Sequence, residues 1–322
     1  MRVDPGQFRQ DAKDKFQDKS FVSIWENTPS IDKDGDEVIN VGLSKGITLM
    51  EAYELPAEID GVKIVYYFAG EIRLMTTKYY DPLIGGVSIG AVDVTAGTYS
   101  GVVYDKDTDE PYLLTNEHVV SNVTNTDPAH PPLEWPILQP GFIDGGKKPA
   151  AGYLYKVGGL KRKALRNEPC NIDAALVCAD RDVDKYEFWG LGQVEEKEYV
   201  DALPGDRVIK VGRTTHVTTN VVASTGVSVN IGGLGWGSPV TVENVIQTRT
   251  AFVQGGDSGS RVWKQDTMEP VGIVFAGSFL TSLIIPARTV CETFGVKYSL
   301  NGSPPVKKKC IFKRLWHKLF GR

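Results

Sequence analysis

The sequence contains no apolar run long enough to cross a bilayer, and no strong internal repeat is visible in it. The longest apolar stretch, GIVFAGSFLTSLIIPA (272–287), is interrupted by Gly, Ser and Thr, whereas a spanning helix needs about 20 apolar residues. Two buried strands joined by a turn explain it better. The opening MRVDPGQFRQDAKDKFQDK also lacks the apolar core of a secretory signal. We therefore expect an ordinary soluble globular protein.

Cysteine and histidine are scarce, with four of each. Cys170, Cys178, Cys291 and Cys310 have neither the paired spacing of metal ligands nor the density of a disulfide framework. One bridge between Cys170 and Cys178 is geometrically possible, but we expect reduced thiols in a reducing compartment. DKDGDE (32–37) invites a calcium-loop interpretation, but the sixth loop position is not glycine and the twelfth is Leu43 rather than glutamate, so we interpret it as a solvated turn. No metal and no cofactor is predicted.

Positive charge is scarce in most of the chain and concentrated at its end. The formal net charge is −4, and residues 306–322 carry seven Lys/Arg and no acid. Residues 1–305 therefore hold 29 basic and 40 acidic side chains, a net charge of −11. An acidic body argues against a nucleic-acid-binding core, and no nucleic-acid partner is expected.

The basic tail has an amphipathic pattern. In CIFKRLWHKLF, helical spacing places six apolar side chains on one face with Lys/Arg opposite: Ile311, Phe312, Leu315, Trp316, Leu319 and Phe320. Such a helix can lie in an anionic membrane interface or dock in a partner's groove. Packing on the protein's own acidic body and disorder remain alternatives. We expect a cytoplasmic protein, peripheral at a membrane if the tail binds lipid.

What the chain has in quantity is turn chemistry. Its 34 glycines and 18 prolines favour β structure over a helical bundle. Residues 1–80 predict a small α/β accessory segment, and residues 301–322 form the tail. Short strands alternating with turns predict two β-barrels, about 81–185 and about 186–300. PARTVCETFGV, with a proline start and a glycine stop, predicts a short helix near the end.

The stretch FVQGGDSGS (252–260) is either a tight turn or a loop that presents a reactive serine. A serine used for acyl transfer needs a base, an acid that orients the base, and N–H donors for an oxyanion. His118 ends an apolar strand in YLLTNEHVV, and His216 is the rival base. His130 lies in a proline-rich loop and His317 in the basic tail. We therefore expect neither of them to lie in a rigid cleft.

Asp173 is the candidate orienting acid. It lies within the apolar segment NIDAALVCA, where a buried carboxylate is costly without a partner. A surface-facing aspartate on an alternating strand is the alternative. His118, Asp173 and Ser258 follow one another at intervals of 55 and 85 residues, and the three signals are worth more together than singly.

These motifs resemble the trypsin/chymotrypsin-like serine peptidases. LLTNEHVV is similar to that family's histidine motif, NIDAALV to its aspartate motif, GGDSGS to its nucleophile motif and EPVGIVFAG to its substrate-aligning strand. The resemblance covers roughly residues 85–300. GGVSIGAVDVTAGT, KVGRTTHVTT and FAGSFLTSLIIPARTV look most like a bacterial and archaeal branch of intracellular-type members. The resemblance implies a mainly β fold with two six-stranded antiparallel β-barrels and a cleft between them.

The resemblance also implies roles for single residues. Ser258 would be the nucleophile, His118 the general base and then acid, and Asp173 the orienting carboxylate. The backbone N–H groups of Gly256 and Ser258 would form the oxyanion hole, and His216 would be a barrel or cleft-lining residue. The implied function is a serine endopeptidase that acts on protein or peptide substrates through an acyl-enzyme. A catalytically silent binding or scaffold module with the same fold is the alternative.

The specificity pocket departs from that of trypsin. Six positions before the serine, where trypsin has an acid, this chain has Phe252. The resemblance therefore implies a pocket for a small or apolar side chain, with substrate contacts at four positions: Phe252, Phe275, Ala276 and Gly277.

Activation by cleavage is not expected either. LIGG (83–86) superficially resembles the activation site of secreted zymogens, but Pro82 precedes it and the stretch is typical of a first barrel strand. Asp257, which would pair with the freed N-terminus in such zymogens, must then have another partner.

Overall fold

The computed structural model describes residues 5–16, 19, 22–25, 29–32, 35–43, 54–68, 77–120, 133–147, 150–166, 168–232 and 239–300. The chain divides into two compact units, Met1–Leu74 and Met75–Arg322, so the division falls after Leu74 rather than after residue 80. The basic tail, His130 and Cys310 lie outside the described residues, and the predictions made for them stay predictions.

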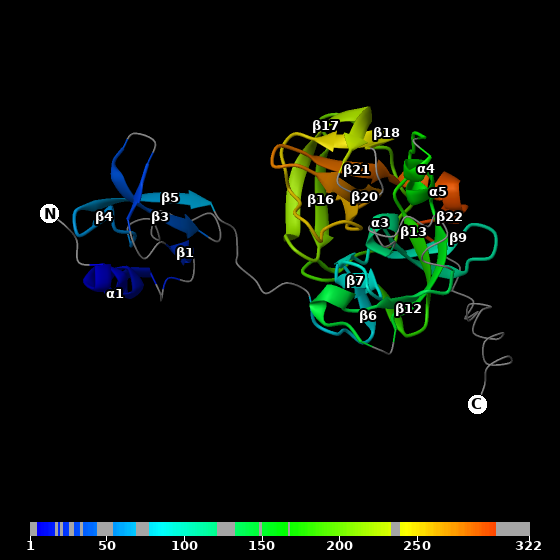
Figure 1. The fold of residues 1–322 in the computed structure, drawn as a ribbon, viewed down its shortest axis with the longest axis horizontal. Helices are drawn as coiled ribbons and strands as arrows, with labels where there is room; N and C mark the ends of the chain where they lie inside the picture. Colours follow the sequence, from blue (N-terminus) through cyan, green and yellow to red (C-terminus); the bar gives the residue numbers. More distant parts are fainter. Residues whose placement is uncertain are drawn as a thin grey trace. The chain divides into compact units, whose positions relative to one another are not determined.

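The first unit is the small α/β segment that the sequence predicts (Figure 1). Its sheet has the order β1-β3-β5-β4, with β2 paired to β3 and with β3 parallel to β5. Phe8, Ala12 and Phe16 recur every four residues along the helix, so they share one face, and they pack in a core with Ile39 and Val41 of the sheet. The elements are α1 Pro5–Phe16, β1 Val22–Trp25, β2 Ser30–Ile31, β3 Glu37–Leu43, β4 Glu58–Ile59 and β5 Val62–Phe68.

The first half of the second unit is an eight-stranded sheet of order β22-β9-β10-β13-β12-β11-β7-β8, and β6, β14 and β15 form a small sheet of their own. Its elements are β6 Leu83–Gly85, β7 Ser88–Ala91, β8 Gly97–Thr98, β9 Gly101–Asp105, β10 Pro111–Thr115, α3 Glu117–Val120, β11 Pro136–Leu138, the 3₁₀ helix η1 Phe142–Asp144, β12 Gly152–Val157, α4 Leu160–Leu165, β13 Ala175–Ala179, β14 Val183–Phe188 and β15 Gly192–Gln193.

This half differs from the six-stranded barrel expected for it. β22, Val296–Lys297, comes from the far end of the chain and pairs with β9, so Val296 lies opposite Asp105. A strand of two residues carries almost no sequence periodicity, and its partner is distant in the chain. The boundary near residue 186 therefore does not separate two independent halves.

The second half forms a closed six-stranded barrel of order β16-β17-β18-β21-β20-β19, in which every neighbouring pair is antiparallel (Figure 1). Side chains from its strands, among them Val208, Val262 and Ile284, fill its interior. The strands are β16 Arg207–Gly212, β17 His216–Ile231, β18 Val240–Thr248, β19 Arg261–Lys264, β20 Pro270–Gly277 and β21 Ser282–Pro286.

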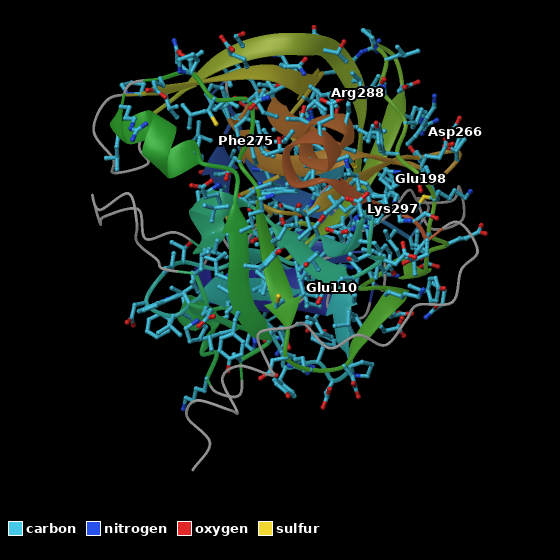
Figure 2. All side chains as sticks on the ribbon, turned by 90° about the vertical axis from the view of Figure 1, so that its right-hand side faces the viewer. Glu110, Glu198, Asp266, Phe275, Arg288 and Lys297 are labelled. Carbon is cyan, nitrogen blue, oxygen red and sulfur yellow. The ribbon has the colours of Figure 1, made fainter. Side chains whose placement is uncertain are left out.

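The predicted helix near the end is confirmed as α5, Ala287–Phe294. Pro286 precedes it, and Gly295 follows in the left-handed conformation (φ 69°) and donates its N–H to the Cys291 carbonyl, as helix ends require. α5 and β22 lie on one face of the unit, where Figure 2 labels Arg288, Lys297 and Glu198.

The cysteines differ in state. Cys170 and Cys291 form no disulfide, whereas Cys178 is disulfide-bonded. The conceivable Cys170–Cys178 bridge is therefore not formed, and the expectation of reduced thiols is wrong for Cys178. In the described part of the chain, no helix is long and apolar enough to span a membrane.

Each unit has a core of its own, so we predict two separate melting transitions. Ile39 of β3 is fully buried in the first core, and Ile39→Ala should destabilise that unit by about 2–5 kcal/mol. Differential scanning calorimetry should show one transition lowered and the other unchanged. Ile284→Ala, at an equally buried position of β21, should shift the other transition instead. A single transition that moves with both variants would contradict independent units.

Candidate active site

His118 lies in a short helix that the rest of the first half fixes in place. β10 ends at Thr115, and α3 begins two residues later with Glu117. The buried Glu117 carboxylate accepts the N–H groups of Gly159 (2.6 Å) and Leu160 (2.9 Å), where α4 begins. Because both of these bonds are buried, α3 has little freedom to move, and the imidazole next to Glu117 is held at a defined position.

Asp173 contacts His118 twice. One carboxylate oxygen accepts the His118 backbone N–H (3.1 Å), and the other lies 2.5 Å from the ring Nδ1. Asp173 is only 1% exposed and lies two residues before β13, rather than inside the strand as the sequence suggested. With Nδ1 bonded to the carboxylate, Nε2 is left to accept a proton from a substrate or a nucleophile.

The pKa of His118 is raised above its ordinary value of 6.5. Burial by itself lowers the pKa of an imidazole, but the charge of Asp173, its hydrogen bond and the charge of Glu117 outweigh that effect. The pair therefore stabilises an imidazolium, which is the form that a general base reaches after it takes a proton.

Ser258 lies in the wall of a cavity of about 570 Å³ and is tied to the half that carries His118. Its carbonyl accepts the N–H of Thr98 in β8 (2.7 Å). A Cβ on Gly97 would lie 2.3 Å from Val119 and 2.8 Å from the Ser258 carbonyl oxygen. Only a glycine at position 97 therefore lets β8 pass between Val119, which follows the histidine, and Ser258.

The serine and the histidine are not directly hydrogen-bonded. Among the hydrogen bonds of the described residues, the His118 side chain bonds only to Asp173. Catalytic hydrogen bonds in sites without substrate are often long and close only when substrate binds, so this arrangement is compatible with Ser258 as nucleophile.

Residues 254–258 form a turn that leaves two donors free. The Asp257 N–H donates to the Gln254 carbonyl (3.0 Å), and Gly256 has a φ of 99°, as the third position of a type II turn requires. A Cβ at Gly256 would also lie 2.4 Å from both Arg213 and Thr214. In the described part of the chain, neither the Gly256 N–H nor the Ser258 N–H donates to another group. Both are available to an oxyanion.

The side chain of Asp257 holds this turn from inside. Its carboxylate is completely buried and accepts the N–H groups of Thr214 (2.8 Å), Thr215 (3.0 Å) and Gln254 (2.9 Å) and the Thr215 hydroxyl (2.6 Å). The ammonium of Lys210, also completely buried, lies 3.4 Å away. This internal lysine is the partner that the sequence left unassigned, and Lys210 was not among the predicted site residues.

Lys210 titrates far below an ordinary lysine. Burial lowers its pKa from 10.5 to about 8, although the charge of Asp257 and its hydrogen bond act in the opposite direction. The ammonium also donates to the Thr215 hydroxyl and to the His216 carbonyl. The only sequence signal for Lys210 is its position in the apolar strand DRVIKVG. Because side chains alternate between the two faces of a strand, a lysine there points either into the interior or toward solvent.

A second ion pair, next to the turn at 254–258, links the two halves of the second unit. Arg213 bonds to Asp144 of η1 through both Nε (2.6 Å) and Nη2. The Arg213 backbone N–H donates to the Thr98 hydroxyl (3.0 Å), which in turn donates to the Gly256 carbonyl (2.9 Å). Thr98 therefore connects the turn, the second half and the first half.

None of the described residues that line the cavity is charged. Its lining residues are Ala251, Val253, Gln254, Gly255, Ser258, Val274, Ala276, Gly277, Ser278 and Phe279. Two of the four predicted substrate contacts, Ala276 and Gly277, are among them. The Phe252 side chain packs in the barrel interior and that of Phe275 in the core shared by both halves, so neither lines the cavity. Val253 and Phe279 were not among the predicted contacts.

His216 and LIGG have structural positions. His216 packs against Trp189 with ring centroids 4.5 Å apart and the rings tilted by 39°, as a barrel-lining residue can. Leu83 of LIGG is fully buried in β6, which agrees with a strand and not with an exposed cleavage site.

The model of a family described as a trypsin-like peptidase domain matches residues 99–273. No curated protein matches the chain. Among solved structures, a Nocardiopsis protease is 15% identical (67% of this chain, 97% of that one, TM-score 0.47) and Thermobifida fusca protease A is 17% identical (67% and 97%, TM-score 0.48). A glutamic-acid-specific serine protease with a histidine triad in substrate binding is 20% identical (67% and 100%, TM-score 0.48).

The site predicts a bell-shaped pH dependence of Ser258 reactivity. Reactivity should rise as His118 loses its proton, with a midpoint above pH 6.5 because its pKa is raised, and fall near pH 8 as Lys210 loses its own. The measurement is the rate at which a fluorophosphonate labels Ser258 at each pH. In Asp173→Asn the acidic midpoint should move down, because the charge that raises the His118 pKa is lost. An unchanged midpoint in that variant would contradict the assignment.

Lys210→Met should disorder the turn at 254–258. The variant leaves the Asp257 carboxylate buried without a cation, which costs about 3–5 kcal/mol, and loss of one oxyanion donor lowers turnover by about 10²–10³-fold. We expect a lower melting temperature, much slower fluorophosphonate labelling of the folded protein, and no decline near pH 8. Lys264→Met is the control, because Lys264 pairs with Asp206 at a more exposed site. A folded Lys210→Met protein with wild-type reactivity would refute this role.

Proposed function

Because the chain belongs to the family of trypsin-like peptidases, whose model covers more than half of it, we propose that this serine-type peptidase is an endopeptidase that works through His118, Asp173 and Ser258. The observation that carries the proposal is the bond between His118 Nδ1 and the buried Asp173 carboxylate. It fixes the tautomer in which Nε2 can take the serine proton.

The proposed reaction uses these groups in turn. Ser258 Oγ attacks the substrate carbonyl while His118 Nε2 accepts its proton, and Asp173 stabilises the resulting imidazolium. The N–H groups of Gly256 and Ser258 donate to the oxyanion of the tetrahedral intermediate. His118 then gives the proton to the leaving amine, which leaves an acyl-enzyme on Ser258. Water, deprotonated by His118, attacks that ester, and His118 returns the proton to Ser258 Oγ as the second product leaves.

The lining of the cavity supports an uncharged side chain before the scissile bond. Val253 and Gly277 both line the cavity and lie close together, because a Cβ added to Gly277 would be 3.0 Å from the Val253 side chain. Since none of the lining residues carries a charge, a Lys, Arg, Asp or Glu side chain would lose its hydration there without an ionic partner. We expect small or medium apolar side chains at this position.

The location of the protein rests on the sequence alone. The amphipathic pattern of Ile311, Phe312, Leu315 and the residues that follow is the basis for a tail that binds an anionic membrane or a partner protein. A cytoplasmic protein that is peripheral at a membrane stays the prediction, although the disulfide at Cys178 removes the argument from reduced thiols. The assignment to an intracellular-type bacterial or archaeal branch also stays a prediction.

A fluorophosphonate probe tests the proposal directly. The wild-type protein should be labelled and should hydrolyse peptides within the chain, whereas Ser258→Ala should do neither. Ser278→Ala is the matched control, because Ser278 lines the same cavity and its loss should leave labelling intact. A folded wild-type protein that resists the probe at neutral pH would favour the silent binding module instead.

A further inference from the structure

The turn between β20 and β21 exposes two large apolar side chains beside the cavity. Phe279 is 89% exposed and Leu280 65% exposed. In the described part of the chain, no large apolar residue is more exposed than Phe279. Phe279 also lines the cavity that contains Ser258. Single exposed apolar residues are ordinary, but a neighbouring pair at the rim of a site is a candidate contact surface.

The turn that carries this pair is rigid. The Ser278 N–H donates to the Thr281 carbonyl (2.8 Å), and the Ser278 hydroxyl accepts the N–H groups of Leu280 (3.1 Å) and Thr281 (3.3 Å). The Thr281 hydroxyl donates to the Thr248 carbonyl (2.7 Å) in β18. Because the backbone is already ordered, an apolar group that binds to Phe279 costs little conformational entropy in the protein.

The strand that leads to this turn has an open edge at the site. β19 pairs with β20 only as far as Ile273, and the backbone groups of Val274 bond to Gly259 and Ser260. Beyond Val274 that edge of β20 has no strand beside it among the described residues, whereas β21 covers the other edge up to Gly277. An extended peptide can add to such an edge as a further strand.

The direction of that peptide places its earlier residues at Phe279. β20 runs from the serine loop toward the turn, and all neighbouring strands of this barrel are antiparallel. A peptide added in the same antiparallel manner therefore runs from the turn toward Ser258, so that residues preceding the scissile bond lie near Gly277 and Phe279. At about 3.3 Å per residue, two to four residues bridge this stretch of strand.

We propose that Phe279, flanked by Leu280, is a specificity-determining subsite for an apolar substrate side chain two to four residues before the scissile bond. The subsite rests on the proposed function, since it requires a peptide that reacts at Ser258. It selects extended segments with apolar residues at two positions, one in the cavity and one on the Phe279 ring. Such segments are ordinarily buried in folded proteins, so unfolded or partly unfolded chains are the substrates that fit.

The test compares two sets of peptides that differ at one position. All peptides share the residue before the scissile bond. In each matched pair, one peptide carries Leu and the other Ser at a single position, which is the second, third or fourth before that bond. Wild type should prefer Leu at one of these positions by about 10-fold in kcat/KM, as expected for burying one apolar side chain. Phe279→Ser should lose this preference through a slower reaction of the Leu peptide alone, and Phe279→Leu should keep most of it.

Two controls show whether a lost preference is specific to the Phe279 ring. Leu203→Ser alters an apolar residue that is 62% exposed and does not line the cavity, so the preference should remain. Fluorophosphonate labelling, which needs no peptide chain, should be equally fast in wild type and Phe279→Ser. An unlabelled wild type would refute the proposed function itself.

Normal labelling with no Leu preference, or with a preference that survives Phe279→Ser, would refute the subsite alone. If Phe279→Ser instead changed the elution volume in size-exclusion chromatography or the binding to anionic vesicles, with the peptide preference intact, the patch would belong to a second copy or to a lipid surface. Either result would also overturn the proposal.

Discussion

The buried carboxylate of Asp257 is the constraint on which the rest of the site depends. It gathers three backbone N–H groups, one hydroxyl and the Lys210 ammonium around one side chain. These contacts fix the turn in which Gly256 and Ser258 present their own N–H groups outward. A buried ion pair contributes little net stability, but the loss of either partner leaves an uncompensated charge. The pair therefore acts mainly on conformation, and it does so without a newly cleaved N-terminus.

Thr98 is the point where the two halves of the second unit are held in register. Its N–H bonds to the Ser258 carbonyl, and its hydroxyl joins the Gly256 carbonyl to the Arg213 backbone. His118 and Asp173 come from the first half and Ser258 from the second. The relative placement of His118 and Ser258 thus depends on β8, a strand of only two residues, and on the absence of a side chain at Gly97.

The surroundings of the serine carry no charged side chain in the described cavity lining. The cavity has uncharged walls, and the rigid turn after β20 adds an exposed aromatic ring at its rim. Phe252 stands where a charged pocket residue would confer basic specificity, yet its side chain is buried in the barrel. Under the proposed function, the selectivity would therefore be set by cavity-lining neighbours such as Val253 and Phe279 and not by Phe252 itself.

The sequence by itself determined the features that depend on local chemistry. The mainly β composition, the helix between Pro286 and Gly295, and the order of histidine, aspartate and serine motifs could all be predicted, because turn residues, caps and motifs act over a few neighbours. Only the tertiary structure decided the pairing of β22 with β9, the burial of Lys210 against Asp257 and the exposure of Phe279. These are contacts between distant segments, and one-dimensional periodicity contains no information on which segments meet.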